Sequence, residues 1–288
     1  MLNKMSYISG EKLQELTDCT VILNTKAYYF LSDQLRRTNT KCYIFNLNVS
    51  NIPYDLCNAK SVFVYTQMLD FFFDKIYPSM RNSFVLVTHN SDDGVSERYK
   101  VFLDGNKIIK WFGQNVEFEH TKLVPLPIGI ANSQWPHGNL ELLDKIRKEN
   151  NPKTNLVYKN FEISTSSANR QHVNELTNAN NIPMSSKVDQ ENYLRSISKS
   201  MYNICPRGNG IDCHRTWESL YLGTIPVVID CVHNRGFQEL PMLFVPNNDW
   251  NTITKSFLES HYQEMMRKIR NDEKLSLDYW RKRISKGE

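Results

Sequence analysis

The sequence has no apolar run long enough to cross a membrane. Its apolar and aromatic runs are short and carry charges, as in QMLDFFFDKIY, whereas a membrane-spanning helix needs roughly 18 or more apolar residues in succession. The first residues, MLNKMSYISGEKLQEL, contain no apolar stretch of signal-peptide length. We therefore expect no membrane span and a cytoplasmic location.

The sequence also lacks a regular cysteine pattern. Six cysteines are spread irregularly over 288 residues, which is not typical of a disulfide framework. Cys205, Cys213, His214, Cys231 and His233 are residue types that bind zinc, but no two cysteines have the close spacing of a zinc site. We expect reduced thiols and no bound metal.

There is no strong excess of charge. The net charge is +4, and the short basic segment YWRKRISKGE is typical of a solvated helix end. This balance excludes nucleic acid as an expected partner. No G-x-x-x-x-G-K-[ST] or G-x-G-x-x-G motif occurs, so neither a P-loop nor a common dinucleotide fingerprint is present.

The first half alternates between strand and helix patterns. Short β-branched, apolar runs predict strands, and longer mixed segments between them predict helices. The strands are expected at 19–24, 41–47, 61–66 and 83–89, and the helices at 27–37 and 66–80. Strands that alternate with helices of this length favour a parallel sheet covered on both faces.

The same alternation starts again after a polar connection at 138–155, which contains a short helix and then Asn-Asn-Pro. The expected strands are LVYKNF, MYNICPR, IPVVID and LFV, the expected helices ANRQHVNELTNAN, ENYLRSISKS and RTWESLYL, and one or two helices fill 252–284. We predict an α/β protein with two Rossmann-like, doubly wound domains, 1–150 and 151–288, that face a cleft. Ligands of such sheets bind beyond the carboxyl ends of the strands.

The stretch CPRGNGIDCHRTWESLYLGTIPVV, residues 205–228, reads as strand, glycine-rich loop, helix and strand. Gly208 and Gly210 allow the backbone to approach a ligand closely. Asp212 is a natural residue to cap the start of the helix, and Gly223 stands where a glycine commonly follows a helix end. The helix would therefore point its N-terminus at the loop.

Phosphate is the ligand that this arrangement favours. A helix N-terminus attracts anions, and Arg207 and Arg215 add two guanidinium groups suited to a diphosphate. Glu218 lies three residues after Arg215 on the same helix face and could accept from ribose hydroxyls. The alternative interpretation is a tight turn followed by a surface Arg–Glu pair.

These residues resemble the donor-binding motif of exostosin-like glycosyltransferases, which carry C-P-R-G, an arginine turn, E-A-L and a final P-V. Arg207, Gly208, Arg215, Glu218 and Pro226 fall on matching positions. A weaker likeness extends over 123–139 and 240–250. Asp212 departs from the pattern, because the family often has glycine there. The compact chain without a membrane anchor is similar to exostosin-like enzymes encoded by large DNA viruses of algae, one of which is a xylosyltransferase. For a viral protein the cytoplasm would be the host cytosol.

The resemblance implies a GT-B fold, a nucleotide-sugar donor, inversion at the anomeric carbon and no essential metal. The expected donor is a UDP-sugar, either UDP-xylose or a UDP-hexose, and the expected acceptor is a glycan hydroxyl. On this basis the donor site is expected to comprise Arg207, Gly208, Asn209, Gly210, Cys213, His214, Arg215 and Glu218. A non-catalytic protein that binds a nucleotide sugar or a glycan is the alternative.

Two further segments are expected to line the cleft. Thr165 and Arg170 follow the first strand of the second domain, where they could reach a diphosphate or simply begin an ordinary helix. Trp135 and His137 lie where the domains meet. They could bind the acceptor sugar or pack at the joint.

The reaction needs a base on the acceptor side. His89, Asp92 and Asp93 follow the predicted strand VLVTH in the first domain, and we favour Asp92, then Asp93, then His89. The alternative is that Asp92-Asp93-Gly94 is an ordinary turn, because Asp and Gly are common turn residues.

Overall fold

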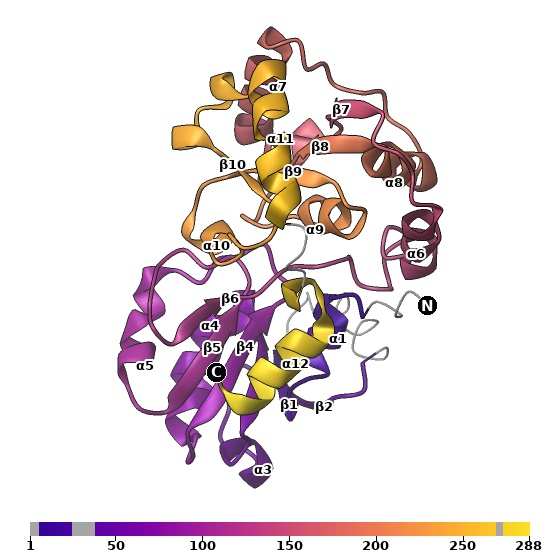
Figure 1. Ribbon diagram of the computed structural model, residues 1–288. Helices are drawn as coiled ribbons and strands as arrows, with labels where there is room; N and C mark the ends of the chain where they lie inside the picture. Colours follow the sequence, from indigo (N-terminus) through magenta and orange to yellow (C-terminus); the bar gives the residue numbers. More distant parts are fainter. Residues whose placement is uncertain (1–5, 25–37, 269–272) are drawn as a thin grey trace. The chain divides into compact units, whose positions relative to one another are not determined.

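The computed structural model describes residues 6–24, 38–268 and 273–288. It divides into two compact units (Figure 1). Unit 1 comprises 1–128, 132–134 and 276–288, and unit 2 comprises 129–131 and 135–275. Each unit is built around one parallel sheet, so the predicted α/β class with two sheets of parallel strands is confirmed. The helix expected at 27–37 lies outside the described residues.

The sheet of unit 1 has six parallel strands in the order β2-β1-β3-β4-β5-β6. The strands are β1 (Cys19–Leu23), β2 (Lys41–Phe45), β3 (Ser61–Tyr65), β4 (Phe84–His89), β5 (Ile108–Gly113) and β6 (Leu123–Pro125). β1, β3 and β4 are buried along their whole length, as their continuous apolar sequences require in a sheet covered on both faces. The strand order reverses between β1 and β3, which is the topological switch point of this sheet.

Short helices and one long helix cover this sheet. The helices are α1 (Gly10–Gln14), α3 (Tyr54–Cys57), α4 (Leu69–Phe71), α5 (Lys100–Asp104) and α12 (Leu277–Lys286). The helix expected at 66–80 is a succession of 3₁₀, α and π turns from Thr66 to Ser79. α12 lies beside α1 (Figure 1). It buries Trp280, whose ring stands edge-on to Phe112 of β5 with 6.4 Å between centroids.

The sheet of unit 2 has four parallel strands in the order β10-β9-β8-β7. They are β7 (Asn155–Tyr158), β8 (Ser200–Ile204), β9 (Ile225–Ile229) and β10 (Leu243–Val245). The helices of this unit are α6 (Leu140–Glu149), α7 (Ser167–Ala179), α8 (Gln190–Ser198), α9 (His214–Tyr221), α10 (Val232–Arg235) and α11 (Lys255–Lys268). Apart from α10, which was not predicted, these elements match the strands and helices predicted for the second half.

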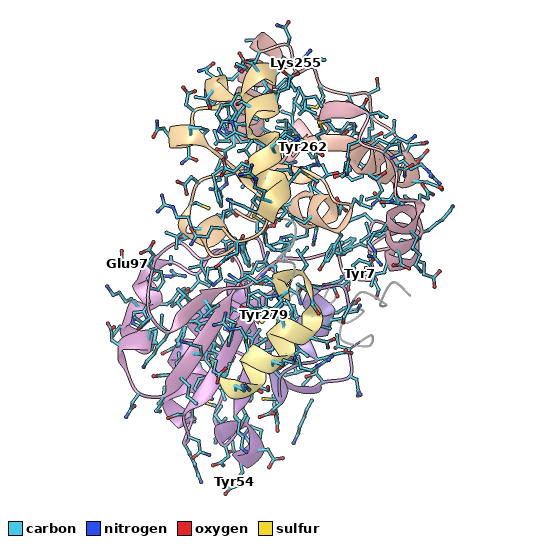
Figure 2. The ribbon with its side chains drawn as sticks, in the orientation of Figure 1. Tyr7, Tyr54, Glu97, Lys255, Tyr262 and Tyr279 are labelled. Carbon is cyan, nitrogen blue, oxygen red and sulfur yellow. The ribbon has the colours of Figure 1, made fainter. Side chains whose placement is uncertain are left out.

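The helices of unit 2 cover both faces of its sheet. α7 and α11 share one core with alternate residues of β8. Tyr202 of that strand packs edge-on against Tyr262 of α11, which is labelled in Figure 2, with 5.9 Å between the ring centroids. Asn203, which points to the other face, donates to Ser219 of α9 at 2.9 Å. The chain therefore changes face between β7 and β8. The carboxyl ends of these parallel strands lie along one edge of the sheet, the edge beyond which open α/β sheets bind ligands.

The limits of the units differ from the predicted boundary at residue 150. α6 belongs to unit 2, because Lys145 bonds Glu191 of α8 at 3.2 Å and Arg195 of α8 pairs with Glu149. Residues 276–288 belong to unit 1, although they were expected in the second domain. Burial of Trp280 and Ile284 on the first sheet accounts for that placement.

A lysine joins the ends of two helices in unit 2. Lys153 Nζ donates to Ser198 O at 2.8 Å, at the end of α8, and to Leu222 O at 3.0 Å, just past α9. It also donates to Thr224 Oγ1 at 2.8 Å. An ammonium group at helix C-termini is favourable because the unpaired carbonyls there carry partial negative charge.

None of the six cysteines forms a disulfide. No helix within the described ranges is long and apolar enough to cross a membrane.

Candidate functional site in unit 2

The stretch 205–228 has the predicted local structure. β8 leads into a loop, α9 begins at His214, and Gly223 follows the helix with a φ of +67°, in the left-handed region that glycine adopts without strain. β9 then begins at Ile225. The N-terminus of α9 therefore faces the end of the glycine-rich loop.

The prediction that Asp212 caps this helix is wrong. The residue at the cap position is Cys213, and no side chain caps the helix. Asp212 is buried, and its two carboxylate oxygens accept from Trp217 Nε1 at 2.9 and 2.8 Å. His233 Nε2 lies 3.3 Å from the same carboxylate. The side chain of Asp212 is thus buried in the interior of the unit, and both of its carboxylate oxygens accept hydrogen bonds there.

Two arginines lie against the same aromatic ring. Arg170 in the first turns of α7 and Arg215 in the first turn of α9 each place the guanidinium carbon 5.8 Å from the centre of the Phe161 ring. Burial, and then the charge of Arg215, lower the pKa of Arg170. Two like charges are thus held close together at the carboxyl ends of β7 and β8.

The hydrogen bonds of both arginines go to neutral groups. Arg170 donates from Nη1 to Glu162 O at 2.7 Å and from Nε to Arg207 O at 3.1 Å. Arg215 Nε donates to Asn160 O at 3.1 Å. Within the part of the chain that the structure describes, neither guanidinium forms an ion pair with a carboxylate. The buried carboxylate of Glu218, one turn further along α9, interacts with Arg215 through its charge without forming an ion pair.

The glycine-rich loop runs directly past Arg170. A Cβ added at Gly208 would lie 3.1 Å from Arg170 Nη2, 3.4 Å from Cys213 Sγ and 3.7 Å from a methyl of Thr165. Arg207 donates from Nη2 to the Asn209 carbonyl at 3.1 Å. Its buried Nε has no hydrogen-bond partner among the described residues.

The structure therefore brings together several residues that the sequence analysis placed at the donor site. We call Arg170, Arg207, Arg215 and Phe161 the arginine cluster. Arg170, Cys213 and Thr165 lie around Gly208. Asn209 is exposed, and Gly210 is buried in the bend that follows. Sequence reasoning missed Phe161. Its signal was an aromatic residue at the end of the predicted strand LVYKNF, immediately before a polar loop.

Glu218 lies on α9, one turn beyond Arg215. It is buried, and its Oε2 accepts from Tyr193 of α8 at 3.0 Å. Burial raises the pKa of Glu218, against the charge of Arg215 and the hydrogen bond from Tyr193, which lower it. One carboxylate oxygen is thus held by Tyr193. Sequence reasoning did not identify this tyrosine.

Three rings in unit 2 lie in a row, which we call the ring row: Trp135, His137 and His214. The first two rings are nearly parallel, at 19°, with centroids 6.2 Å apart, and the last two are 6.1 Å apart. His214 Nδ1 lies 2.8 Å from Gly129 O. Trp135 and His137 were expected in the first domain, on the acceptor side, but they belong to unit 2 with the arginine cluster.

The candidate bases belong to unit 1. His89 ends β4 and is buried, with Nδ1 at 3.1 Å from Asn90 Oδ1 and Nε2 at 3.0 Å from Pro127 O. Both ring nitrogens thus face oxygen atoms. Asp92 and Asp93 are exposed in the turn that follows the strand, where a side chain remains accessible to a substrate.

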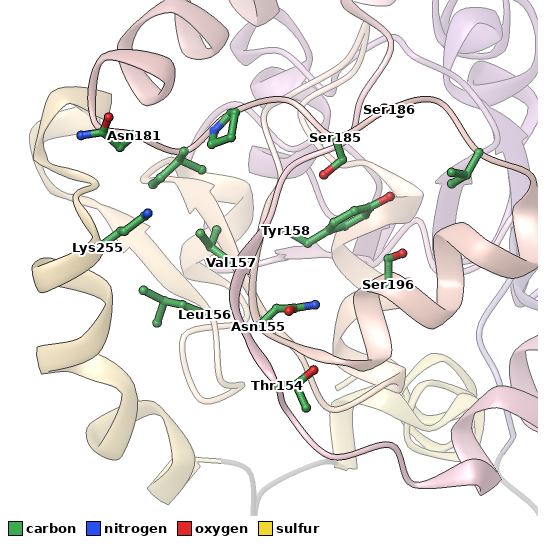
Figure 3. A pocket seen from close by; sticks show the side chains of 13 residues that line it. Thr154, Asn155, Leu156, Val157, Tyr158, Asn181, Ser185, Ser186, Ser196 and Lys255 are labelled. Carbon is green, nitrogen blue, oxygen red and sulfur yellow. The ribbon is translucent and has the colours of Figure 1, made fainter.

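A groove of about 610 Å³ runs beside the free edge of β7 (Figure 3). The edge strand, the segment 181–188, Ser196 of α8 and Lys255 of α11 line it. Asn160 ties this segment to the arginine cluster, because its Nδ2 donates to Ser186 O at 2.9 Å while its carbonyl accepts from Arg215. No sequence pattern predicted this groove.

No known protein family matches the chain, and no curated protein does. Among the residues that the structure describes, no group of three or more His, Cys, Asp or Glu side chains is arranged to hold a metal ion. The functional argument therefore depends on the geometry of unit 2 and on the motif in 205–228.

Proposed function

We propose that this chain is an inverting glycosyltransferase of the GT-B type, which transfers a sugar from a UDP-sugar to a glycan hydroxyl. The donor's diphosphate would bind at the arginine cluster. The observation that carries the proposal is the pair Arg170 and Arg215 on the ring of Phe161, with no carboxylate paired to either. Holding two buried positive charges close together is costly, and a bound anion would offset that cost.

The place of the cluster supports a phosphate ligand. It lies at the carboxyl ends of β7 and β8, where the helices change face, and at the start of α9. Backbone N–H groups at a helix start favour an anion, and guanidinium groups bind phosphate oxygens with charge-assisted hydrogen bonds. The buried Nε of Arg207 adds a donor without a protein partner among the described residues.

The groove beside β7 in the same unit is our candidate site for the nucleoside. Its volume of about 610 Å³ lies within the usual range of small-molecule sites. It connects to Arg215 through Asn160. A ligand with a diphosphate at the cluster and a nucleoside toward the groove would occupy both features.

The proposed chemistry is a single displacement at the anomeric carbon. The acceptor oxygen forms the new bond while its proton passes to a base, for which Asp92 is our first candidate. The bond from the anomeric carbon to the phosphate oxygen breaks, and its electron pair leaves with the diphosphate. Arginines held in place before the reaction stabilise the charge that develops there.

The test is UDP binding by calorimetry, with Arg215→Ala compared to wild type. Loss of a charge-assisted contact costs roughly 1.5–3 kcal/mol, so affinity should fall about tenfold to over a hundredfold. Arg195→Ala is the matched control. Arg195 lies in the last turn of α8, and its charge is already paired with Glu149 and Glu191. An Arg215→Ala protein that is folded and binds UDP like wild type would refute the phosphate assignment. Release of UDP from a UDP-sugar distinguishes an enzyme from a protein that only binds the nucleotide.

A further inference from the structure

The ring row connects the start of α9 with an exposed indole. His214 is the first residue of α9, between Cys213, whose Sγ is 3.9 Å from Arg170 Nη2, and Arg215. At the far end of the row, Trp135 is 47% exposed. A single exposed aromatic residue is ordinary on a protein surface. This one is joined through two imidazole rings to the arginine cluster.

The orientation of His214 is fixed by a backbone carbonyl. A carbonyl oxygen only accepts, so the contact of 2.8 Å with Gly129 O places the ring proton on Nδ1. In the neutral ring, Nε2 is then the acceptor. Gly129 has a φ of +67°, a left-handed conformation that favours glycine. The direction of this carbonyl, and with it the ring, depends on a position where other residues are strained.

The row has the chemistry of a site for a neutral sugar. It consists of an indole and two imidazoles, with no carboxylate, ammonium or guanidinium group in the row itself. An indole face packs against the C–H groups of a pyranose, and imidazole nitrogens bond its hydroxyls. A sugar with a carboxylate would find no cation among the three rings to compensate it, because the guanidinium groups of the arginine cluster would be bound to the diphosphate.

We infer that the ring row binds the sugar of the donor and selects a neutral pyranose over a uronic acid. This inference builds on the proposed function. The row belongs to the unit that holds the arginine cluster, and it starts at the residue directly before Arg215. A sugar linked to a diphosphate at the cluster would lie near the start of α9, where the row begins.

The experiment measures binding of UDP, UDP-glucose, UDP-xylose and UDP-glucuronate by calorimetry. Wild type should bind at least one neutral UDP-sugar more tightly than UDP-glucuronate. Trp135→Ala should bind UDP like wild type but neutral UDP-sugars about three- to tenfold more weakly, since stacking on the ring is lost. Trp135→Phe should keep most of the affinity. Met266→Ala, which removes another exposed apolar side chain of unit 2, should change nothing.

His214→Ala should also weaken UDP-sugar binding more than UDP binding. The inference is overturned if Trp135→Ala and His214→Ala leave UDP-sugar affinity unchanged, or if they lower the affinities for UDP and UDP-sugar equally. It is also overturned if UDP-glucuronate binds as tightly as the better bound of UDP-glucose and UDP-xylose. No binding of UDP by wild type would instead reject the proposed function, and this inference with it.

Discussion

Arg170 and Arg215 approach one phenyl ring, that of Phe161, at the same distance of 5.8 Å. The two residues are 45 positions apart in the sequence (215 − 170), and each begins a different helix. The ring gives both guanidinium groups a surface to lie on, because a cation is attracted to an aromatic face. The shared ring is thus a reason why two positive charges can stay close together before a ligand arrives.

Replacing Arg170 by lysine should separate its charge from its geometry. Lysine keeps the charge but cannot reproduce both hydrogen bonds to Glu162 O and Arg207 O. We expect about 1–3 kcal/mol lower stability and weaker UDP binding. Urea unfolding and calorimetry measure the two effects. If Arg170→Lys matches wild type in both, the guanidinium is not what holds the loop.

Replacing Glu218 by glutamine should loosen UDP binding while the protein stays folded, since a neutral amide is a weaker acceptor for ribose hydroxyls than a carboxylate. Tyr193→Phe is the matched control, because it removes the neighbouring donor and leaves Glu218 in place. Calorimetry with UDP reads out both variants. An unchanged affinity in Glu218→Gln would mean that Glu218 has a structural role beside Tyr193.

Asp92→Asn should abolish most sugar transfer and leave UDP affinity unaltered, because a base acts on the acceptor and not on the nucleotide. Asp93→Asn is the next variant to test. His89→Gln should mainly lower the melting temperature, since His89 is buried and both its ring nitrogens have neighbours. Transfer within a few-fold of wild type in all three variants would place the base elsewhere.

UDP binding and transfer should survive treatment with a chelator. The arginine cluster and the start of α9 supply the positive charge that a divalent ion provides in other enzymes. UDP affinity measured before and after EDTA, and again with Mn²⁺ added, tests this. Activity that disappears with EDTA and returns with Mn²⁺ would contradict it.

Lys153 should make stability depend on pH. Burial lowers its pKa from 10.5 to about 8. Between these values the unfolded chain holds a proton that the folded protein has lost, so raising the pH through this window stabilises the folded state. Relative to Lys153→Met, wild type should gain on the order of 1–2 kcal/mol between pH of about 7.5 and about 10.5. Urea unfolding of both proteins at the two pH values measures the gain. If the difference in free energy of unfolding between wild type and Lys153→Met is the same at both pH values, the pKa of Lys153 is not lowered.

Local signals predicted the elements of the site well. The order of strand, loop, helix and strand in 205–228 and the glycine after α9 depend on neighbouring residues, and the structure confirms them. The fate of Asp212 could not be predicted in this way. An aspartate before a helix looks like a cap, but Trp217 and His233 take its carboxylate, and the contact with His233 depends on tertiary packing.

The sequence also could not predict which elements far apart in the chain pack together. The apolar residues of the last helix predict a buried face but do not say which sheet it covers, and Trp280 lies on that of unit 1. Arg170 could have been an ordinary helix residue until the structure placed it beside Arg215 and Gly208. Contacts of this kind depend on the three-dimensional arrangement and not on local pattern.

The return of α12 to unit 1 has a consequence for synthesis on the ribosome. Domains commonly fold as they emerge, the earlier ones first. Here unit 2 is complete once residue 275 has been added, whereas unit 1 still lacks 276–288. The part of the sheet of unit 1 that Trp280 covers stays open until then. The unit that starts first is therefore the last to be finished, and a released chain that ends at residue 275 should have a folded unit 2 beside a unit 1 that remains sensitive to protease.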